Sequence, residues 1–327
     1  MSLIEQYDSL LLDLDGTVWA GGDAIAGAVE AITTSGLPAA YVTNNASRGP
    51  AEVAEKLRAI GLEAADADIV TSAQAAIVMA SEYLEPGDPV LVVGAPSFKE
   101  LATQAGYRVV DSVDDHPKVV LHGHSPETGW AQLSEAALSI RQGATYLASN
   151  LDTTLPMERG LHVGNGSMVA AVTSATGVVP ASAGKPEPAM FFQAAEVMNS
   201  KAPLAVGDRL DTDIAGAVAA KMDSMHVLTG VSGPMALIEA TPEMRPRYIA
   251  ENMSGLYDDP FALVPGPQGG FTARVDGEDI LLERGNPDAT SIEALRTVLN
   301  VAWSMPHAPA FIRPMSDAAD AATAQWW

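Results

Sequence analysis

Two acidic side chains, Asp13 and Asp15, directly follow the apolar run Leu10–Leu12. Residues i and i+2 of an extended strand project to the same side, so both carboxylates face one side of the strand end. Like charges held this close repel each other unless a cation or a shared proton lies between them. Gly16 and Thr17 break the strand, which puts the acids at its carboxyl end, where open α/β sheets bind ligands. The pattern favours a hard divalent cation, Mg²⁺ first; a turn capped by two acids is the plainer alternative.

A second polar cluster follows the β-prone run 39–42. Thr43, Asn44 and Asn45 end this run, and a helix-like stretch begins at Ala51. A threonine at a strand end, with backbone N–H groups beyond it, is suited to hold an anionic oxygen. Asn44 is a candidate for contacting a substrate or orienting the neighbouring acid. The alternative is that these side chains cap the following helix.

Lys185 lies between Gly184 and Pro186. A phosphate-binding P-loop is excluded, because Val179 stands where the first glycine is required and Pro186 where Ser or Thr is. A proline restricts the backbone of the residue before it, which suits a fixed cation that faces a phosphate and a carboxylate. A second glycine-rich stretch, 164–167, lacks a lysine and indicates the entry to a helix.

A third acidic cluster follows the apolar run Leu204–Val206. Gly207 and Asp208 end the run, and Asp213 comes just before a helix of small residues. Asp208 and Asp213 can converge on one ion if the residues between them form a loop. The alternative, acids placed at a helix N-terminus for dipole reasons, explains Asp213 but not the whole pattern.

These segments together resemble the haloacid dehalogenase superfamily, and within it the NagD-like phosphatases. The resemblance covers about residues 7–260, and it implies a hydrolase that acts on phosphoric monoesters. The segments that carry it are 13–18, 42–45, 149–156, 184–186 and 207–214.

The resemblance implies a role for each catalytic candidate. Asp13 would attack phosphorus and form an aspartyl-phosphate. Asp15 would protonate the leaving alkoxide and then deprotonate the hydrolytic water. Thr43 and Lys185 would bind the oxygens of the phosphoryl group.

The same resemblance implies the ligands of Mg²⁺. They would be Asp13, the backbone carbonyl of Asp15 and Asp208, with Asp213 as a further ligand or acting through water. Four polar residues are the candidates for substrate binding: Asn44, Asn45, Asn150 and Asp152.

The order of apolar and helical stretches predicts an α/β fold. Short apolar strands alternate with helices, as in a doubly wound parallel sheet with helices on both faces. More than a hundred residues separate Asn45 from Lys185, so a module must be inserted between them. We expect a haloacid-dehalogenase-like core at 1–87 and 181–260, and an α/β cap domain at 88–180 that covers the site and selects substrates.

The segment 261–327 differs from the rest. It predicts a hairpin over 271–283 and an amphipathic helix over 291–305, with Arg296 at the surface. Such a small extension cannot build its own core, so the helix must pack on the core, on the cap, or on a second subunit in a homodimer. We expect the terminal pair Trp326–Trp327 to anchor a final helix.

The amino-acid composition limits the kinds of molecule that this protein is expected to bind. The formal net charge is −23, from 41 acidic and 18 basic side chains, which disfavours nucleic acid and anionic membranes. There is no cysteine, so disulfides and thiol catalysis are excluded. The N-terminus shows no signal-peptide pattern, and no apolar run approaches the roughly 20 residues that cross a bilayer. We therefore expect a soluble cytoplasmic protein.

The predicted substrate is a small phosphorylated metabolite. NagD-like proteins with an added C-terminal segment resemble actinobacterial glycerol 3-phosphate phosphatases, which favours glycerol 3-phosphate or a similar polyol phosphate. Nucleoside monophosphates, phosphoglycolate and pyridoxal phosphate stay open as alternatives. A phosphate-binding regulator or a phosphotransferase would be a different class of function.

Overall fold

The computed structural model describes residues 2–157 and 159–326 of the chain. These residues form two compact units. Unit 1 contains the residues up to Ala39 and those from Asn199 onward, and unit 2 contains Ala40–Met198. The boundaries expected for a core, a cap and an extension remain a prediction.

Unit 1 is built on parallel strands in the order β15-β14-β13-β1. They are β1 (Ser9–Leu12), β13 (Pro203–Gly207), β14 (Asp223–Val227) and β15 (Tyr248–Ala250). The strands are almost wholly buried, as expected when helices cover both faces of a parallel sheet. The accompanying helices are α1 (Ala28–Ser35), α8 (Ala215–Ala219), α9 (Pro234–Ile238) and α10 (Pro260–Leu263). The apolar runs that predicted β1 and β13 are confirmed.

Unit 2 contains two sets of parallel strands. The first is the pair β4 (Ala39–Thr43) and β5 (Ile69–Thr71). The helices α2 (Pro50–Ala59), α3 (Ser72–Ala80) and α7 (Ala189–Val197) accompany this pair.

The second sheet of unit 2 has the order β12-β9-β8-β6-β7, and all its pairings are parallel. Its strands are β6 (Pro89–Val93), β7 (Arg108–Val110), β8 (Val119–His122), β9 (Thr145–Ala148) and β12 (Ala181–Ser182). Its helices are α4 (Pro96–Gln104), α5 (Trp130–Arg141) and α6 (Asn165–Thr176). A separate apolar core, with Val120, Ile140 and Val169 among its members, lies between this sheet and the helices α5 and α6. The prediction of a second α/β module is confirmed.

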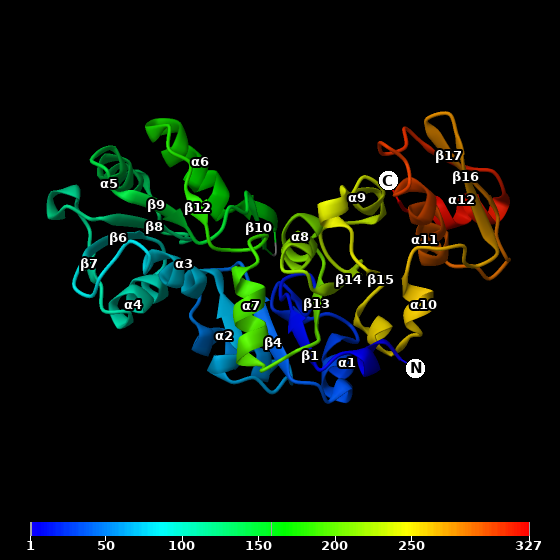
Figure 1. Cartoon of the computed structure of the whole chain (residues 1–327), viewed down its shortest axis with the longest axis horizontal. Coiled ribbons are helices and arrows are strands. Elements are labelled where there is room, and N and C mark those ends of the chain that lie inside the picture. Colours follow the sequence, from blue (N-terminus) through cyan, green and yellow to red (C-terminus); the bar gives the residue numbers. More distant parts are fainter. Residues whose placement is uncertain (1, 158, 327) are drawn as a thin grey trace. The chain divides into compact units, whose positions relative to one another are not determined.

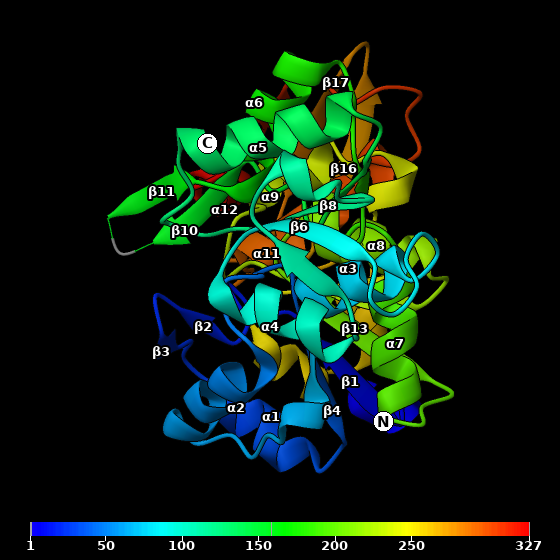
Figure 2. The same ribbon diagram turned by 90° about the vertical axis from the view of Figure 1, so that its left-hand side faces the viewer.

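Unit 2 also contains an antiparallel hairpin that was not predicted. Strands β10 (Thr154–Met157) and β11 (Gly160–Val163) form an antiparallel hairpin (Figure 2). All four residues of β11 are exposed, so the alternation of apolar and polar residues that marks a half-buried strand is absent.

The described helices are short. The longest, α5, α6 and α11 (Ser291–Ala302), have 12 residues each. None of the helices in the described ranges is long and apolar enough to cross a membrane.

The C-terminal segment forms a three-stranded sheet with two helices (Figure 1). The predicted hairpin is present as β16 (Phe271–Asp276) and β17 (Asp279–Arg284), and the predicted amphipathic helix is α11. An unpredicted strand, β18 (Ile312–Pro314), pairs with β17 in parallel, and α12 (Asp317–Thr323) follows it.

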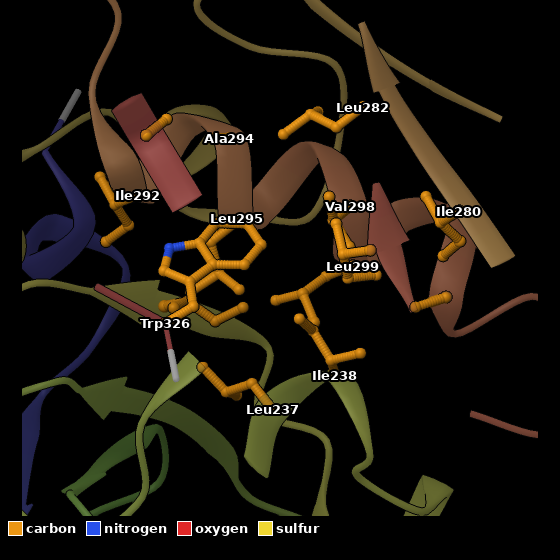
Figure 3. Packing of buried hydrophobic residues seen from close by; sticks show 14 of the residues in the cluster. Leu237, Ile238, Ile280, Leu282, Ile292, Ala294, Leu295, Val298, Leu299 and Trp326 are labelled. Atoms are coloured by element: carbon orange, nitrogen blue, oxygen red, sulfur yellow. The ribbon is translucent and has the colours of Figure 1, made fainter. Parts of the chain in front are cut away.

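Helix α11 packs on the rest of unit 1. Its buried side chains Leu295, Val298 and Leu299 share one apolar cluster with Leu237 and Ile238 of α9 (Figure 3). Of the three partners considered for this helix, the structure therefore shows the core of unit 1.

Trp326 anchors the end of the described chain, as predicted. It belongs to the same apolar cluster as α11 and is 5% exposed. Its indole Nε1 donates a hydrogen bond to Ser291 Oγ at 2.9 Å. Trp327 lies outside the described residues.

The surface position predicted for Arg296 is wrong. The side chain is 6% exposed, and its Nε donates to the carbonyl of Ile249 at 3.0 Å. Burial lowers the pKa of the guanidinium from its ordinary value. Arg296 lies four residues after Ile292 and therefore on the buried stripe of α11, where it satisfies the carbonyl of a short edge strand.

Replacing Leu299 by alanine tests whether α11 contributes to the core of unit 1. Leu299 is fully buried, so we expect the free energy of unfolding to fall by about 2–5 kcal/mol in chemical denaturation. Asn300→Ala is the matched control, because Asn300 is exposed on the same helix. A loss below about 1 kcal/mol for Leu299→Ala would contradict the packing in Figure 3.

Candidate active site

The first predicted acid, Asp13, directly follows β1. Its backbone N–H donates to the carbonyl of Val206 on β13 at 2.9 Å, which extends the pairing of the two strands. Thr17 is fully buried, and its hydroxyl lies 3.4 Å from Asp13 Oδ2 and 3.5 Å from Asp208 Oδ1. Gly16 has φ +99°, and a Cβ there would lie 2.5 Å from Asp208 Oδ2. The loop after β1 therefore needs glycine at this position to approach Asp208.

Asp208 and Asp213 lie at and just beyond the end of β13. Asp208 is fully buried, and its Oδ2 accepts a hydrogen bond from the backbone N–H of Val231 at 2.6 Å. Asp213 is 4% exposed, and its Oδ2 accepts from the N–H of Arg209 at 3.0 Å. Asp213 lies within a π-helical turn, Leu210–Ile214, a local irregularity that is frequent at functional sites.

Asp13, Asp208 and Asp213 form one carboxylate cluster. Each offers one oxygen, and these oxygens all lie within 4.8 Å of one another. Two of the three carboxylates are nearly or fully buried, so their mutual repulsion is only weakly screened. An all-oxygen donor set of this charge fits a hard divalent cation.

Asp15 is held differently from the carboxylate cluster. It is partly buried, and its Oδ1 accepts a hydrogen bond from the indole Nε1 of Trp19 at 2.9 Å. This bond restrains the orientation of the Asp15 carboxylate. The expectation that the Asp15 carbonyl ligates the metal remains a prediction.

His226 supports the loop around Asp208. It is fully buried near the end of β14, and its ring Nε2 lies 2.8 Å from the carbonyl of Ser232. Burial lowers the pKa of His226 to about 4, so at neutral pH the ring is uncharged and Nε2 donates to this carbonyl. The N–H of Ser232 in turn donates to the backbone carbonyl of Asp208 at 3.1 Å.

Thr43 and Asn45 close the end of β4 in unit 2. Thr43 is 3% exposed, and its Oγ1 accepts a hydrogen bond from the N–H of Asn45 at 3.0 Å. The Oδ1 of Asn45 accepts from the N–H of Ser47 at 3.0 Å. Both side chains therefore stabilise the turn that follows β4. They do not cap α2, whose N-cap residue is Gly49 and which has no side-chain cap.

Asn44 holds the backbone of Lys185. Its Oδ1 accepts from the N–H of Lys185 at 2.8 Å, and its Nδ2 donates to the carbonyl of Lys185 at 3.0 Å. The same Nδ2 lies 3.3 Å from Asp152 Oδ1. Lys185 is only 3% exposed, and its Nζ donates to the carbonyl of Val42 at 2.8 Å. Asn44, Asp152 and Lys185 thus lie together at the end of β4, although Asn44 is 108 positions from Asp152 and 141 positions from Lys185 along the chain.

Asn150 joins this group. It is 3% exposed, and its Nδ2 donates to the backbone carbonyl of Asn44 at 2.6 Å. Its Oδ1 accepts from the N–H of Asp152 at 3.2 Å. Ser72, which the sequence analysis missed, donates from its hydroxyl to the same Asn44 carbonyl at 2.6 Å.

The predicted residues therefore form two groups. Asp13, Asp15, Asp208 and Asp213 belong to unit 1. The other six belong to unit 2: Thr43, Asn44, Asn45, Asn150, Asp152 and Lys185. The sequence analysis did not identify Thr17 and Trp19 as site residues, although both lie within six residues of Asp13. Their hydroxyl and indole N–H groups are donors close to two acids in the sequence, and this proximity could have identified them.

Two protein-family models match the chain. A model of haloacid dehalogenase-like hydrolases matches residues 10–108, and a model of HAD-hydrolase-like proteins matches residues 182–256. The first range contains Asp13, and the second contains Lys185, Asp208 and Asp213. The matched ranges therefore include the carboxylate cluster and the buried lysine.

Named relatives are also similar to the chain. A D-glycerol 3-phosphate phosphatase from Mycobacterium tuberculosis is 42% identical over 321 residues, which are 96% of this chain and 91% of the relative. An acid sugar phosphatase from Staphylococcus aureus is 39% identical over 234 residues, which are 70% of this chain and 89% of the relative.

Solved structures extend the similarity to the fold. A glycerol phosphate phosphatase from Mycobacterium tuberculosis in complex with calcium has a TM-score of 0.93 and 41% identity, and the match covers 100% of this chain and 98% of that one. The structure in complex with magnesium has a TM-score of 0.92 and 41% identity, with 99% and 98% covered. The similarity thus includes the C-terminal segment.

Asp208→Asn tests whether the carboxylate cluster holds a divalent cation. The substitution removes one negative charge and keeps an oxygen that accepts from Val231. Without divalent ions we expect the variant to melt no lower than the wild type, because repulsion falls. Saturating MgCl₂ should raise the melting temperature of the wild type by mass action but hardly that of the variant.

Asp211→Asn is the matched control for this measurement. The Asp211 side chain is 55% exposed and pairs with Arg209 at 2.9 Å. We expect it to keep the full rise with MgCl₂. An equal rise in Asp208→Asn would show that Asp208 is not a metal ligand.

Proposed function

This chain is a phosphatase of the haloacid dehalogenase-like hydrolase family, and we propose that it hydrolyses glycerol 3-phosphate with Mg²⁺ as its cofactor. The observation that supports the reaction is the cluster of Asp13, Asp208 and Asp213 at the ends of β1 and β13. The substrate proposal rests on the name of the Mycobacterium tuberculosis relative, with which this chain shares 42% identity over 96% of its length.

We propose that Asp13 and Asp15 carry the chemistry in two steps. An oxygen of Asp13 attacks phosphorus, the P–O bond to the substrate breaks, and the leaving alkoxide takes a proton from Asp15. Asp15 then accepts a proton from water, which attacks phosphorus and releases inorganic phosphate and free Asp13. The hydrogen bond from Trp19 to Asp15 Oδ1 supports this role, because it engages one carboxylate oxygen and orients the other.

We propose that Thr43 and Lys185 bind the oxygens of the phosphoryl group. Both are buried and held by backbone hydrogen bonds, so their donors need little reorganisation during the reaction. Asp13, the Asp15 carbonyl and Asp208 would hold the cation, with Asp213 close by. Bound there, Mg²⁺ would neutralise part of the phosphoryl charge.

The candidates for substrate binding differ in how far their side chains are exposed. The side chains of Asn44 and Asn150 already bond to backbone groups and are almost fully buried, which favours a supporting role for both. Asp152 is partly exposed, and its carboxylate can accept hydrogen bonds from substrate hydroxyls. We propose Asp152 as the contact that selects a polyol phosphate, within a cap formed by residues 88–180.

A panel of phosphate esters tests the proposed substrate. We expect kcat/KM for glycerol 3-phosphate to exceed that for nucleoside monophosphates, phosphoglycolate, pyridoxal phosphate and sugar phosphates by at least about tenfold. EDTA should abolish phosphate release, and MgCl₂ should restore it. A sugar phosphate that is hydrolysed best would favour the function named for the Staphylococcus aureus relative.

Substitutions of Asp13 and Asp15 should have different effects on catalysis and on metal affinity. Asp13→Asn removes the nucleophile, so we expect kcat to fall by more than about 10³-fold and metal affinity to weaken. Asp15→Asn removes the proton donor but leaves the metal ligands in place. It should keep its affinity for Mg²⁺, and p-nitrophenyl phosphate, which has a good leaving group, should recover part of the first step. Normal turnover by Asp13→Asn would show that Asp13 is not the nucleophile.

A further inference from the structure

The start of α6 packs directly against the loop that carries Asn150 and Asp152. The backbone N–H of Gly166 donates to the carbonyl of Asp152 at 2.8 Å. A Cβ on Gly166 would lie 2.0 Å from the carbonyl oxygen of Leu151, and one on Gly164 would lie 2.3 Å from that of Asp152. Only glycine allows the two backbones to approach this closely.

Asn165, between these glycines, holds two strand ends. It is 2% exposed, and its Nδ2 donates to the backbone carbonyls of Asn150 at 2.8 Å and His122 at 3.3 Å. Among the described residues its Oδ1 has no hydrogen-bond partner. The contribution of Asn165 therefore comes from its two amide N–H donors.

Helix capping does not explain Asn165. A capping side chain accepts hydrogen bonds from free N–H groups of the first helical turn. The residue before α6 is Gly164, and the amide of Asn165 donates to carbonyls outside the helix. The side chain instead stabilises the loop that follows β9.

A continuous chain of hydrogen bonds leads from Asn165 to Lys185. Asn165 donates to Asn150, Asn150 donates to the carbonyl of Asn44, and Asn44 bonds to both the N–H and the carbonyl of Lys185. The four residues are between 2% and 8% exposed. Water cannot readily replace a bond that is lost in such a buried network, so a shift of one member displaces the next.

We propose that Asn165 is a positioning residue for catalysis: through Asn150 and Asn44 it sets the position of the Lys185 ammonium without touching the substrate. This inference rests on the proposed role of Lys185 in binding the phosphoryl group. Because small displacements of a catalytic group are costly, loss of the two donors lowers turnover while substrate contacts outside the phosphoryl group remain.

The test compares Asn165→Asp with the wild type on glycerol 3-phosphate and on p-nitrophenyl phosphate. Aspartate has the shape of asparagine but cannot donate to the two carbonyls. We expect kcat to fall by about 10- to 100-fold on both esters, with KM changed by less than about threefold. Asn165→Ala, which introduces no charge, takes the place of Asn165→Asp if the latter does not fold. A kcat within twofold of the wild type would overturn the proposal.

Tyr146→Phe is the matched control. The Tyr146 hydroxyl lies 2.8 Å from Nδ1 of the buried His122, so its loss also removes a buried hydrogen bond in this sheet. It takes no part in the chain to Lys185. We expect a lower melting temperature but a normal kcat; an equal loss of kcat in both variants would show that Asn165 acts only through general stability.

A double variant separates positioning from an independent effect. If Asn165 acts through Asn44, Asn165→Asp should lower kcat little further in an Asn44→Ala background. If the fold-losses of kcat in the two single variants multiply in the double variant, the proposal is overturned. Because p-nitrophenyl phosphate is included throughout, the positioning role can be judged even if glycerol 3-phosphate proves not to be the substrate.

Discussion

The mutual repulsion of Asp13, Asp208 and Asp213 is the constraint on which the rest of unit 1 depends. Three carboxylates with oxygens within 4.8 Å of one another are stable only when donors and a cation surround them. The N–H groups of Val231 and Arg209 supply part of this compensation. The all-oxygen cluster fits a divalent cation, which would supply the rest. The apolar cluster around α11 opposes the repulsion, because it includes Leu210 and Ile214 of the turn that carries Asp213 and so holds this turn in place.

The sequence predicted the elements whose signal is local. Buried parallel strands such as β1 and β13 are continuous apolar runs, and the polar residues that follow them mark the sheet edge where ligands bind. Arg296 and β15 were missed because their structure comes from tertiary contacts. Strand β15 has three residues, and its Ile249 carbonyl is satisfied by an arginine 47 positions away. No local pattern contains that information.

The distinction between local sequence signals and long-range contacts applies to the candidate active site as well. Sequence motifs identified Asn44 and Asn150 as polar residues at the end of strands, but they could not show what the amides bond to. In the structure both amides hold backbone groups, and the partners of Asn44 lie more than a hundred residues away. The roles of these asparagine side chains therefore depend on long-range pairing, which no local motif reports.

The strongly acidic composition and an anionic substrate are compatible because charge acts at two length scales. The net charge of −23 opposes approach of a phosphate ester, but salt screens this field beyond about 8 Å at physiological ionic strength. Near the phosphoryl group, burial makes each interaction stronger than it would be in water. Lys185 is 3% exposed and held by hydrogen bonds to Val42 and Asn44, and in its proposed role of binding the phosphoryl group it would be a cation of this kind. A few buried, well-held charges thus decide binding, while the many exposed carboxylates mainly slow the encounter.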